Sequence, residues 1–256
     1  KWGIADSAYS TQAIFFDYDK DGDLDMLLIN HAPHPFQNLD EASLTFLRNQ
    51  RDSQVGVKLY QNIRSAFKEV TATSGLVNSR LSFGLGVSVA DVNNDNWPDI
   101  YISNDYMAED CLYINNQNGT FTDRIREMLG YTSEFSMGND VSDINNDGWN
   151  DIYTLDMLPE DNHRQKILSS IDNYEFFKVR ENVGMNPEFM RNMLHVNNRD
   201  KSFSEIAQLS GISNTDWSWA PLFADFDNDG WKDLFITNGF VHDYTNMDFI
   251  KFMGDY

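Results

Sequence analysis

The sequence predicts an all-β fold assembled from repeated four-stranded units. An acidic run of nine residues occurs four times in one register, and short apolar, β-branched segments flank these runs. Asn-rich turns between further apolar segments then mark a second strand pair in three places. Four-stranded units that recur along a chain are typical of the blades of a β-propeller.

The four acidic runs occupy residues 17–25, 91–99, 143–151 and 225–233, and we refer to them as loops 1 to 4. Each has oxygen-bearing side chains at its positions 1, 3, 5 and 9. Such crowded carboxylates repel one another unless a cation neutralises them, and Ca²⁺ takes six to eight oxygen ligands from flexible loops. Position 6 is glycine in three loops and Asn96 in loop 2, as a sharp turn with positive φ requires.

The sequence therefore predicts about four Ca²⁺ sites. Side chains at positions 1, 3, 5 and 9 are the expected ligands, and the backbone carbonyl of position 7 is added by analogy with other calcium loops. The expected metal-binding residues are Asp17, Asp19, Asp21, Asp23 and Asp25 in loop 1; Asp91, Asn93, Asp95, Trp97 and Asp99 in loop 2; Asp143, Asn145, Asp147, Trp149 and Asp151 in loop 3; and Asp225, Asp227, Asp229, Trp231 and Asp233 in loop 4.

An EF-hand is the main alternative for a loop of this kind, and two features argue against it. An EF-hand loop ends with a bidentate Glu at position 12 and lies between helices. Position 12 is here Leu28, Ile102, Thr154 or Ile236. The flanking segments, such as AIFF before loop 1 and IYIS after loop 2, are typical of strands. Each loop is therefore expected to join two antiparallel strands.

The second strand pairs are expected within residues 58–71, 111–123 and 192–206. Uneven spacing between the loops predicts two insertions, at about 31–57 and 156–190. In the second insertion Ile167, Leu168, Ile171 and Tyr174 fall at helical spacing, which predicts a helix on one rim. A further helix is expected in 244–256.

A family resemblance rests on two strings. Residues 83–105, FGLGVSVADVNNDNWPDIYISND, resemble the FG-GAP repeat of integrin α-subunit propellers. Residues 215–239 resemble surface proteins of Bacteroidota, and the whole chain is similar to FG-GAP/VCBS proteins that are ASPIC/UnbV-associated and cartilage-acidic-protein-like. The resemblance implies a seven-bladed propeller, of which residues 1–256 are expected to form a part.

Charge and cysteine content limit the classes of partner and of cross-link that this chain can have. The formal net charge is −21, and four bound divalent ions would reduce it to about −13. Nucleic acid and anionic lipid are disfavoured as partners, because both require basic patches. Cys111 is the single cysteine, so no internal disulfide is possible. No apolar run approaches the length of roughly 18 residues that a membrane span needs.

We expect a non-enzymatic calcium-binding platform on the extracellular or outer-membrane surface that binds a protein or glycan. No catalytic motif such as GxSxG is present, and Glu160, Asp161 and His163 are expected to be solvated loop charges. The tryptophans at position 7 are expected to pack in the core or between blades rather than against sugars. Two rivals remain: a carbohydrate-active, polysaccharide-lyase-like propeller, and a structural subunit of an outer-membrane complex.

Overall fold

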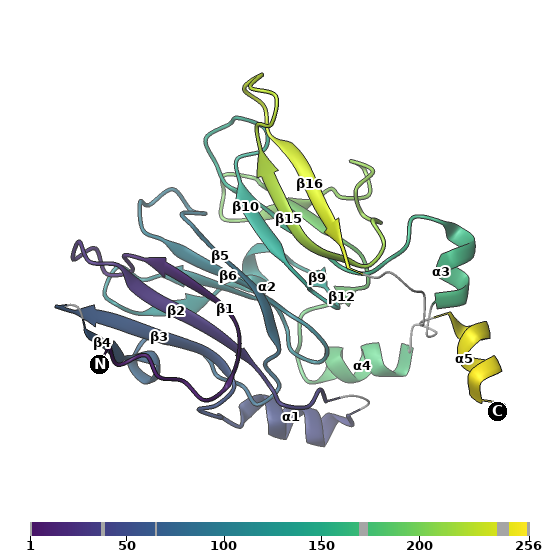
Figure 1. Ribbon diagram of the computed structural model, residues 1–256, viewed down its shortest axis with the longest axis horizontal. Helices are drawn as coiled ribbons and strands as arrows, with labels where there is room; N and C mark the ends of the chain where they lie inside the picture. The colour runs from purple at the N-terminus through teal and green to yellow at the C-terminus, as the bar shows by residue number, and fades with distance from the viewer. Residues whose placement is uncertain (1, 37–38, 65, 169–173, 240–245, 255–256) are drawn as a thin grey trace.

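Three four-stranded antiparallel sheets follow one another along the chain, and a two-stranded sheet comes fourth (Figure 1). The computed structural model describes residues 2–36, 39–64, 66–168, 174–239 and 246–254. Within each four-stranded sheet the strands lie side by side in sequence order, as in a propeller blade. The predicted all-β architecture of four-stranded blades is confirmed.

Sheet 1 contains β1 (Tyr9–Phe16), β2 (Asp25–His31), β3 (Gly56–Ile63) and β4 (Ala66–Glu69). Sheet 2 contains β5 (Gly84–Ala90), β6 (Asp99–Asn104), β7 (Cys111–Asn115) and β8 (Phe121–Asp123). Sheet 3 contains β10 (Asn139–Ser142), β11 (Asp151–Thr154), β13 (Met193–Asn197) and β14 (Phe203–Glu205). Sheet 4 pairs β15 (Ser218–Ala224) with β16 (Asp233–Asn238), and two short parallel strands, β9 (Thr132–Ser133) and β12 (Glu188–Phe189), pair separately.

The sheets stack face to face, and their first strands β1, β5, β10 and β15 contact one another in that order. Alternation along β6 shows how one strand serves two interfaces. Ile100 and Ile102 pack into the core shared with sheet 1, whereas Tyr101 packs against sheet 3. A central strand of this kind is buried on both faces, which explains why its sequence is almost continuously apolar.

Glycines of positive φ precede the blades. Gly75 has a φ of 82°, and a Cβ at this position would lie 2.3 Å from the carbonyl oxygen of Phe121 in β8. Ser74, one residue earlier, accepts a hydrogen bond from the backbone N–H of Phe121 at 2.7 Å. The close approach of the incoming chain to β8 therefore requires a residue without a side chain.

The helices occur mainly in the insertions. The first insertion contains α1 (Glu41–Asn49), and the second contains α3 (Asn162–Leu168) and α4 (Tyr174–Asn182). Ile171, part of the expected helical pattern, lies outside the described residues. The remaining elements are the 3₁₀ turn η1 (Thr71–Thr73), α2 (Ile125–Met128) and the C-terminal α5 (Met247–Gly254).

Topology separates the loops from the insertions. Loops 1 to 4 join the first and second strands of their sheets, whereas both insertions follow a second strand. Because successive turns of an antiparallel sheet lie at opposite ends, the four acidic loops share one end of the blades, here called the loop end. The opposite end, called the insertion end, carries α1 and α4 (Figure 1).

Candidate metal centres

All four acidic loops adopt one backbone conformation. Position 4 has positive φ in each loop, between 55° and 61°, although it is occupied by Lys20 or by asparagine. Position 6 also has positive φ, 68° at Asn96 and 85° to 92° at the glycines. Asparagine and glycine tolerate this region better than other residues, so the expected turn at position 6 is present and a second one at position 4 was missed.

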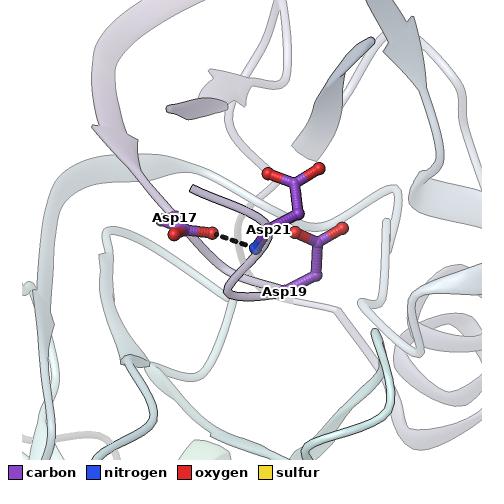
Figure 2. A group of neighbouring side chains, drawn as sticks. All are labelled: Asp17, Asp19 and Asp21. Carbon is purple, nitrogen blue, oxygen red and sulfur yellow. Dashed lines mark hydrogen bonds between the residues drawn. The ribbon is translucent and has the colours of Figure 1, made fainter. Parts of the chain in front are cut away.

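The first aspartate of each loop organises the turn. In loop 1 the backbone N–H of Asp21 donates to Asp17 Oδ1 at 3.1 Å (Figure 2). The backbone N–H of Gly22 donates to Asp17 Oδ2 at 3.0 Å. The same pair of bonds from positions 5 and 6 reaches Asp91, Asp143 and Asp225 in the other loops. The turn of each loop is thus closed by hydrogen bonds within the loop.

Carboxylate oxygens converge in loops 1 and 4. Asp17, Asp19 and Asp21 each contribute an oxygen, and these oxygens lie within 4.8 Å of one another (Figure 2). Asp225, Asp227 and Asp229 form an equivalent group. Three anionic oxygens this close are a suitable donor set for a hard divalent cation.

One buried oxygen tests whether a cation would fit. Asp19 Oδ1 is buried and has no hydrogen-bond partner among the described residues, while Asp19 Oδ2 accepts from Gln61 Nε2 at 2.7 Å. A buried oxygen without a partner is costly, and more so when it carries charge. The residues of loop 1 therefore fit a bound cation.

Loops 2 and 3 have an amide at position 3. Asn93 Oδ1 accepts from the backbone N–H of Asp95 at 2.9 Å, and Asn93 Nδ2 donates to Asp95 Oδ2 at 3.1 Å. In loop 3 an arginine reaches the position-5 carboxylate, because Arg199 donates to Asp147 Oδ2 at 2.8 Å. These two loops carry less uncompensated negative charge than loops 1 and 4.

The aspartate at position 9 has a second role that the sequence did not reveal. Asp99 accepts from the backbone N–H of Val92 at 3.0 Å and from that of Asn115, in the third strand, at 2.8 Å. Asp25 and Asp151 accept the same two kinds of bond. Burial raises the pKa of Asp99 to about 7, and the two backbone bonds oppose this shift. Position 9 therefore ties loops 1, 2 and 3 to the third strands of their own sheets.

Asparagines at the ends of third strands connect neighbouring sheets. Asn115 Nδ2 donates to the carbonyl of Tyr18 in loop 1 at 2.9 Å, and Asn197 Nδ2 donates to that of Val92 in loop 2 at 2.8 Å. The recurrence of asparagine in QN, IN and VN at the ends of the third strands, Asn62 included, was the signal that could have revealed this role.

Neighbouring loops also contact one another directly. Asn94, at position 4 of loop 2, donates to the carbonyl of Gly148 in loop 3 at 3.1 Å. Asn146 makes the equivalent bond to Gly230 in loop 4 at 2.8 Å. Between loops 1 and 2, Lys20 Nζ instead lies 4.7 Å from the centroid of the Trp97 ring. Position 4 therefore links each loop to the next one.

The insertion end holds a second group of acids, which the sequence pattern did not indicate. Asp110 is buried and accepts hydrogen bonds from the backbone N–H of Asn104 at 2.8 Å, from the Tyr101 hydroxyl at 2.7 Å and from the Ser136 hydroxyl at 2.8 Å. Burial nevertheless raises the pKa of Asp110 to about 7. Asp156 is also buried, and its pKa is raised to about 6 by the same cause.

Basic residues from the insertions form ion pairs with acidic residues at this end. Arg180 of α4 forms a buried ion pair with Glu188 of β12. Arg48 of α1 pairs with Glu109 at 2.7 Å and also donates to the carbonyl of Val183 at 3.1 Å. These ion pairs add to an apolar cluster in which Leu44 of α1 and Val179 of α4 pack with Met107.

The remaining predicted residues have ordinary surroundings. Glu160, Asp161 and His163 are exposed, and Asp161 accepts from the backbone N–H of Arg164 at the start of α3. Trp97 and Trp149 are half-buried, but Trp231 is 56% exposed. The packing expected for the tryptophan at position 7 is therefore wrong for loop 4, because within the described residues no third strand covers β16.

Comparison with known proteins supports the fold. A family model described as an FG-GAP-like repeat matches residues 91–154, which contain loops 2 and 3, and residues 183–236, which contain loop 4. The chain therefore contains FG-GAP-like repeats. A comparison with curated proteins found no match.

A comparison with solved structures found several matches. One is a lectin from Agrocybe aegerita, described in terms of its specific recognition of non-reducing terminal N-acetylglucosamine. It is 15% identical with a TM-score of 0.42, and the match covers 87% of this chain and 45% of the lectin chain. The chain thus spans about half the length of that structure. Among the described residues, no helix has the length and apolar character needed to cross a membrane.

Proposed function

We propose that this chain is a calcium-binding, non-enzymatic interaction module that acts on the extracellular or outer-membrane surface. The convergence of three carboxylates in loops 1 and 4, with Asp19 Oδ1 buried and unpartnered among the described residues, is the observation that carries the proposal. Bound Ca²⁺ would supply the positive charge that offsets repulsion among these oxygens. FG-GAP-like repeats support a role in protein or glycan binding.

The chain's own residues have distinct roles in this proposal. Asp17, Asp19 and Asp21 would hold the ion in loop 1, together with Asp25 and the carbonyl of Asp23. The backbone bonds from positions 5 and 6 to Asp17 orient the first ligand before any ion arrives. Since each loop is joined to its neighbour through position 4, order in one loop supports order in the next.

The acidic composition supports a location outside the cell. A net charge of −21 with a single cysteine suits a protein whose cross-links are metal ions rather than disulfides. Ca²⁺ is abundant outside cells, where weak sites with dissociation constants of about 10⁻⁴ to 10⁻³ M are filled.

Isothermal titration calorimetry with Ca²⁺ tests the metal sites directly. We expect about four ions per chain, and Asp17→Asn combined with Asp225→Asn should remove two of them. The matched control is Glu127→Gln, which removes a carboxylate that is 61% exposed and lies outside the loops. Absence of Ca²⁺ binding, or equal losses in the control, would refute the proposal.

The non-enzymatic part of the proposal has its own test. Uronic-acid polysaccharides are incubated with the protein, and the absorbance of unsaturated products is followed. We expect no increase over a heat-treated sample. A sustained increase would favour a lyase-like propeller instead.

A further inference from the structure

A groove opens between sheets 1 and 2 at the loop end. Its volume is about 450 Å³, within the range of roughly 300–1,000 Å³ that is usual for small-molecule sites. Sheet 1 contributes Asp19, Gln61 and Thr73 to its lining, and sheet 2 contributes Trp97, Gln117 and Thr120. The functions described above use the Trp97 ring only as the partner of Lys20 and the Gln61 amide only as a donor to Asp19.

The two glutamines are held in place by carboxylates. Gln61 Nε2 donates to Asp19 Oδ2 at 2.7 Å, and Gln117 Nε2 donates to Asp95 Oδ2 at 3.0 Å. Each bond uses one N–H of the amide and fixes its orientation, which leaves the carbonyl oxygen available to a ligand. Because Asp19 Oδ1 belongs to the candidate metal centre, we assign no ligand contact to it.

Trp97 supplies an apolar surface beside these polar groups. It is half-buried, and its backbone N–H donates to Asp95 Oδ1 at 2.8 Å. An indole ring combined with amides and hydroxyls matches a pyranose, which has apolar C–H faces and a rim of hydroxyl groups. Hydroxyl groups both donate and accept, as the amides and threonines of the groove do.

Charge excludes two other ligand classes. An anion is disfavoured because Asp19 and Asp95 hold the two glutamines and the net charge is −21. An organic cation is disfavoured because the Lys20 ammonium already lies 4.7 Å from the centroid of the Trp97 ring. A neutral, hydroxyl-rich ligand remains.

We propose that this groove binds a neutral pyranose unit of a glycan, with the sugar packed against Trp97 and hydrogen-bonded by Gln61 and Gln117. The inference deepens the proposed function and rests on it, because it names the ligand class of the interaction module.

The next interface along the chain provides an internal contrast. Gln61 directly precedes Asn62, and the residue in the same place before Asn115 is Ile114. Gln117 follows Asn115 by two residues, and the residue in the same place after Asn197 is Arg199, which pairs with Asp147. The interface between sheets 2 and 3 thus lacks both glutamines, and only the groove between sheets 1 and 2 is expected to bind sugar.

Titration calorimetry at saturating Ca²⁺, with a panel of neutral methyl glycosides, tests the inference. We expect at least one glycoside to bind, and Trp97→Ala and Gln117→Arg each to weaken it by about tenfold or more. Arg199→Gln is the matched control, since it makes the reverse exchange at the other interface, and it should leave sugar binding unchanged. Thermal melting confirms that each variant is folded, and Gln117→Arg replaces an exposed side chain in case Trp97→Ala does not fold.

The outcomes separate the two proposals. Binding of Ca²⁺ without binding of any glycoside overturns the groove and leaves the calcium module standing. Sugar binding without any Ca²⁺ binding overturns the calcium sites and leaves the groove standing. Preferential binding of methyl glucuronides or of tetramethylammonium, or an equal loss in Arg199→Gln, also overturns the inference.

Discussion

The two ends of the blades both concentrate carboxylates but satisfy them differently. At the insertion end Asp110 accepts three hydrogen bonds, and Glu188 is paired with Arg180. At the loop end Asp17, Asp19 and Asp21 take part in no ion pair within the described residues. The insertions bring their own cations to the sheets, whereas the loops leave oxygens for a cation from solution.

Removal of Ca²⁺ should produce the largest loss of stability, and it should act at the loop end. Under the calcium proposal, each site would stabilise the fold by about 2.7 kcal/mol with Ca²⁺ present at 100 times its dissociation constant. With several sites filled, excess EGTA should lower the melting temperature markedly in differential scanning calorimetry. EGTA already saturated with Ca²⁺ is the control, and an unchanged melting temperature would contradict a cation-dependent loop end.

Loss of Arg180 should produce the next largest effect, at the insertion end. Arg180→Leu leaves the Glu188 carboxylate buried without its partner, which typically costs about 3–5 kcal/mol. Urea unfolding measures this loss, and Lys178→Leu, on the exposed side of α4, should change little.

The double variant Arg180→Leu with Glu188→Leu sharpens this test. Removing both charges should recover much of the lost stability, because no unpaired buried charge remains. If the single and double variants are equally unstable, packing rather than charge attaches α4.

The free energy of unfolding should depend on pH through Asp110, at the insertion end. Burial raises its folded pKa to about 7, above the value of the unfolded chain, so folding favours the protonated form. This contribution to stability is complete below a pH of about 4 and is lost as the pH rises through about 7. Asp110→Asn should flatten the decline between about pH 4 and 7 by on the order of 1–3 kcal/mol.

Urea unfolding at several pH values, in constant Ca²⁺, provides the measurement for Asp110. Asp200→Asn, in the exposed β13–β14 turn, is the control for a general charge effect. A decline with pH of the same size in Asp110→Asn and in the unchanged protein would place its cause elsewhere.

The smallest expected effect is a difference in Ca²⁺ affinity between the loops. Loops 1 and 4 have aspartate at position 3, and we expect them to bind Ca²⁺ more tightly than loops 2 and 3, which have asparagine. Asp19→Asn should weaken loop 1 and Asn93→Asp should strengthen loop 2, each by about tenfold. Calorimetry that ranked the loops in the opposite order would refute this difference.

Sequence alone predicted the loops and the hairpins because their determinants are local. Asp17 is within five residues of every backbone N–H that orients it, and the strand pairs are joined by short turns. Positions 1, 3 and 5 could therefore be assigned as partners from their spacing along the chain. The double role of Asp25 could not, since one of its donors is the backbone of Asn62, in a different strand.

The sequence by itself determined the repeated blade, the register of its acidic loops and the chemistry that those loops offer to a cation. Only the tertiary structure decided that Arg180 meets Glu188, that Asp110 is buried among hydroxyl groups, and that Gln61 and Trp97 line one groove. The reason is physical: a turn is closed by hydrogen bonds a few residues apart, whereas these contacts depend on how separate sheets and insertions pack.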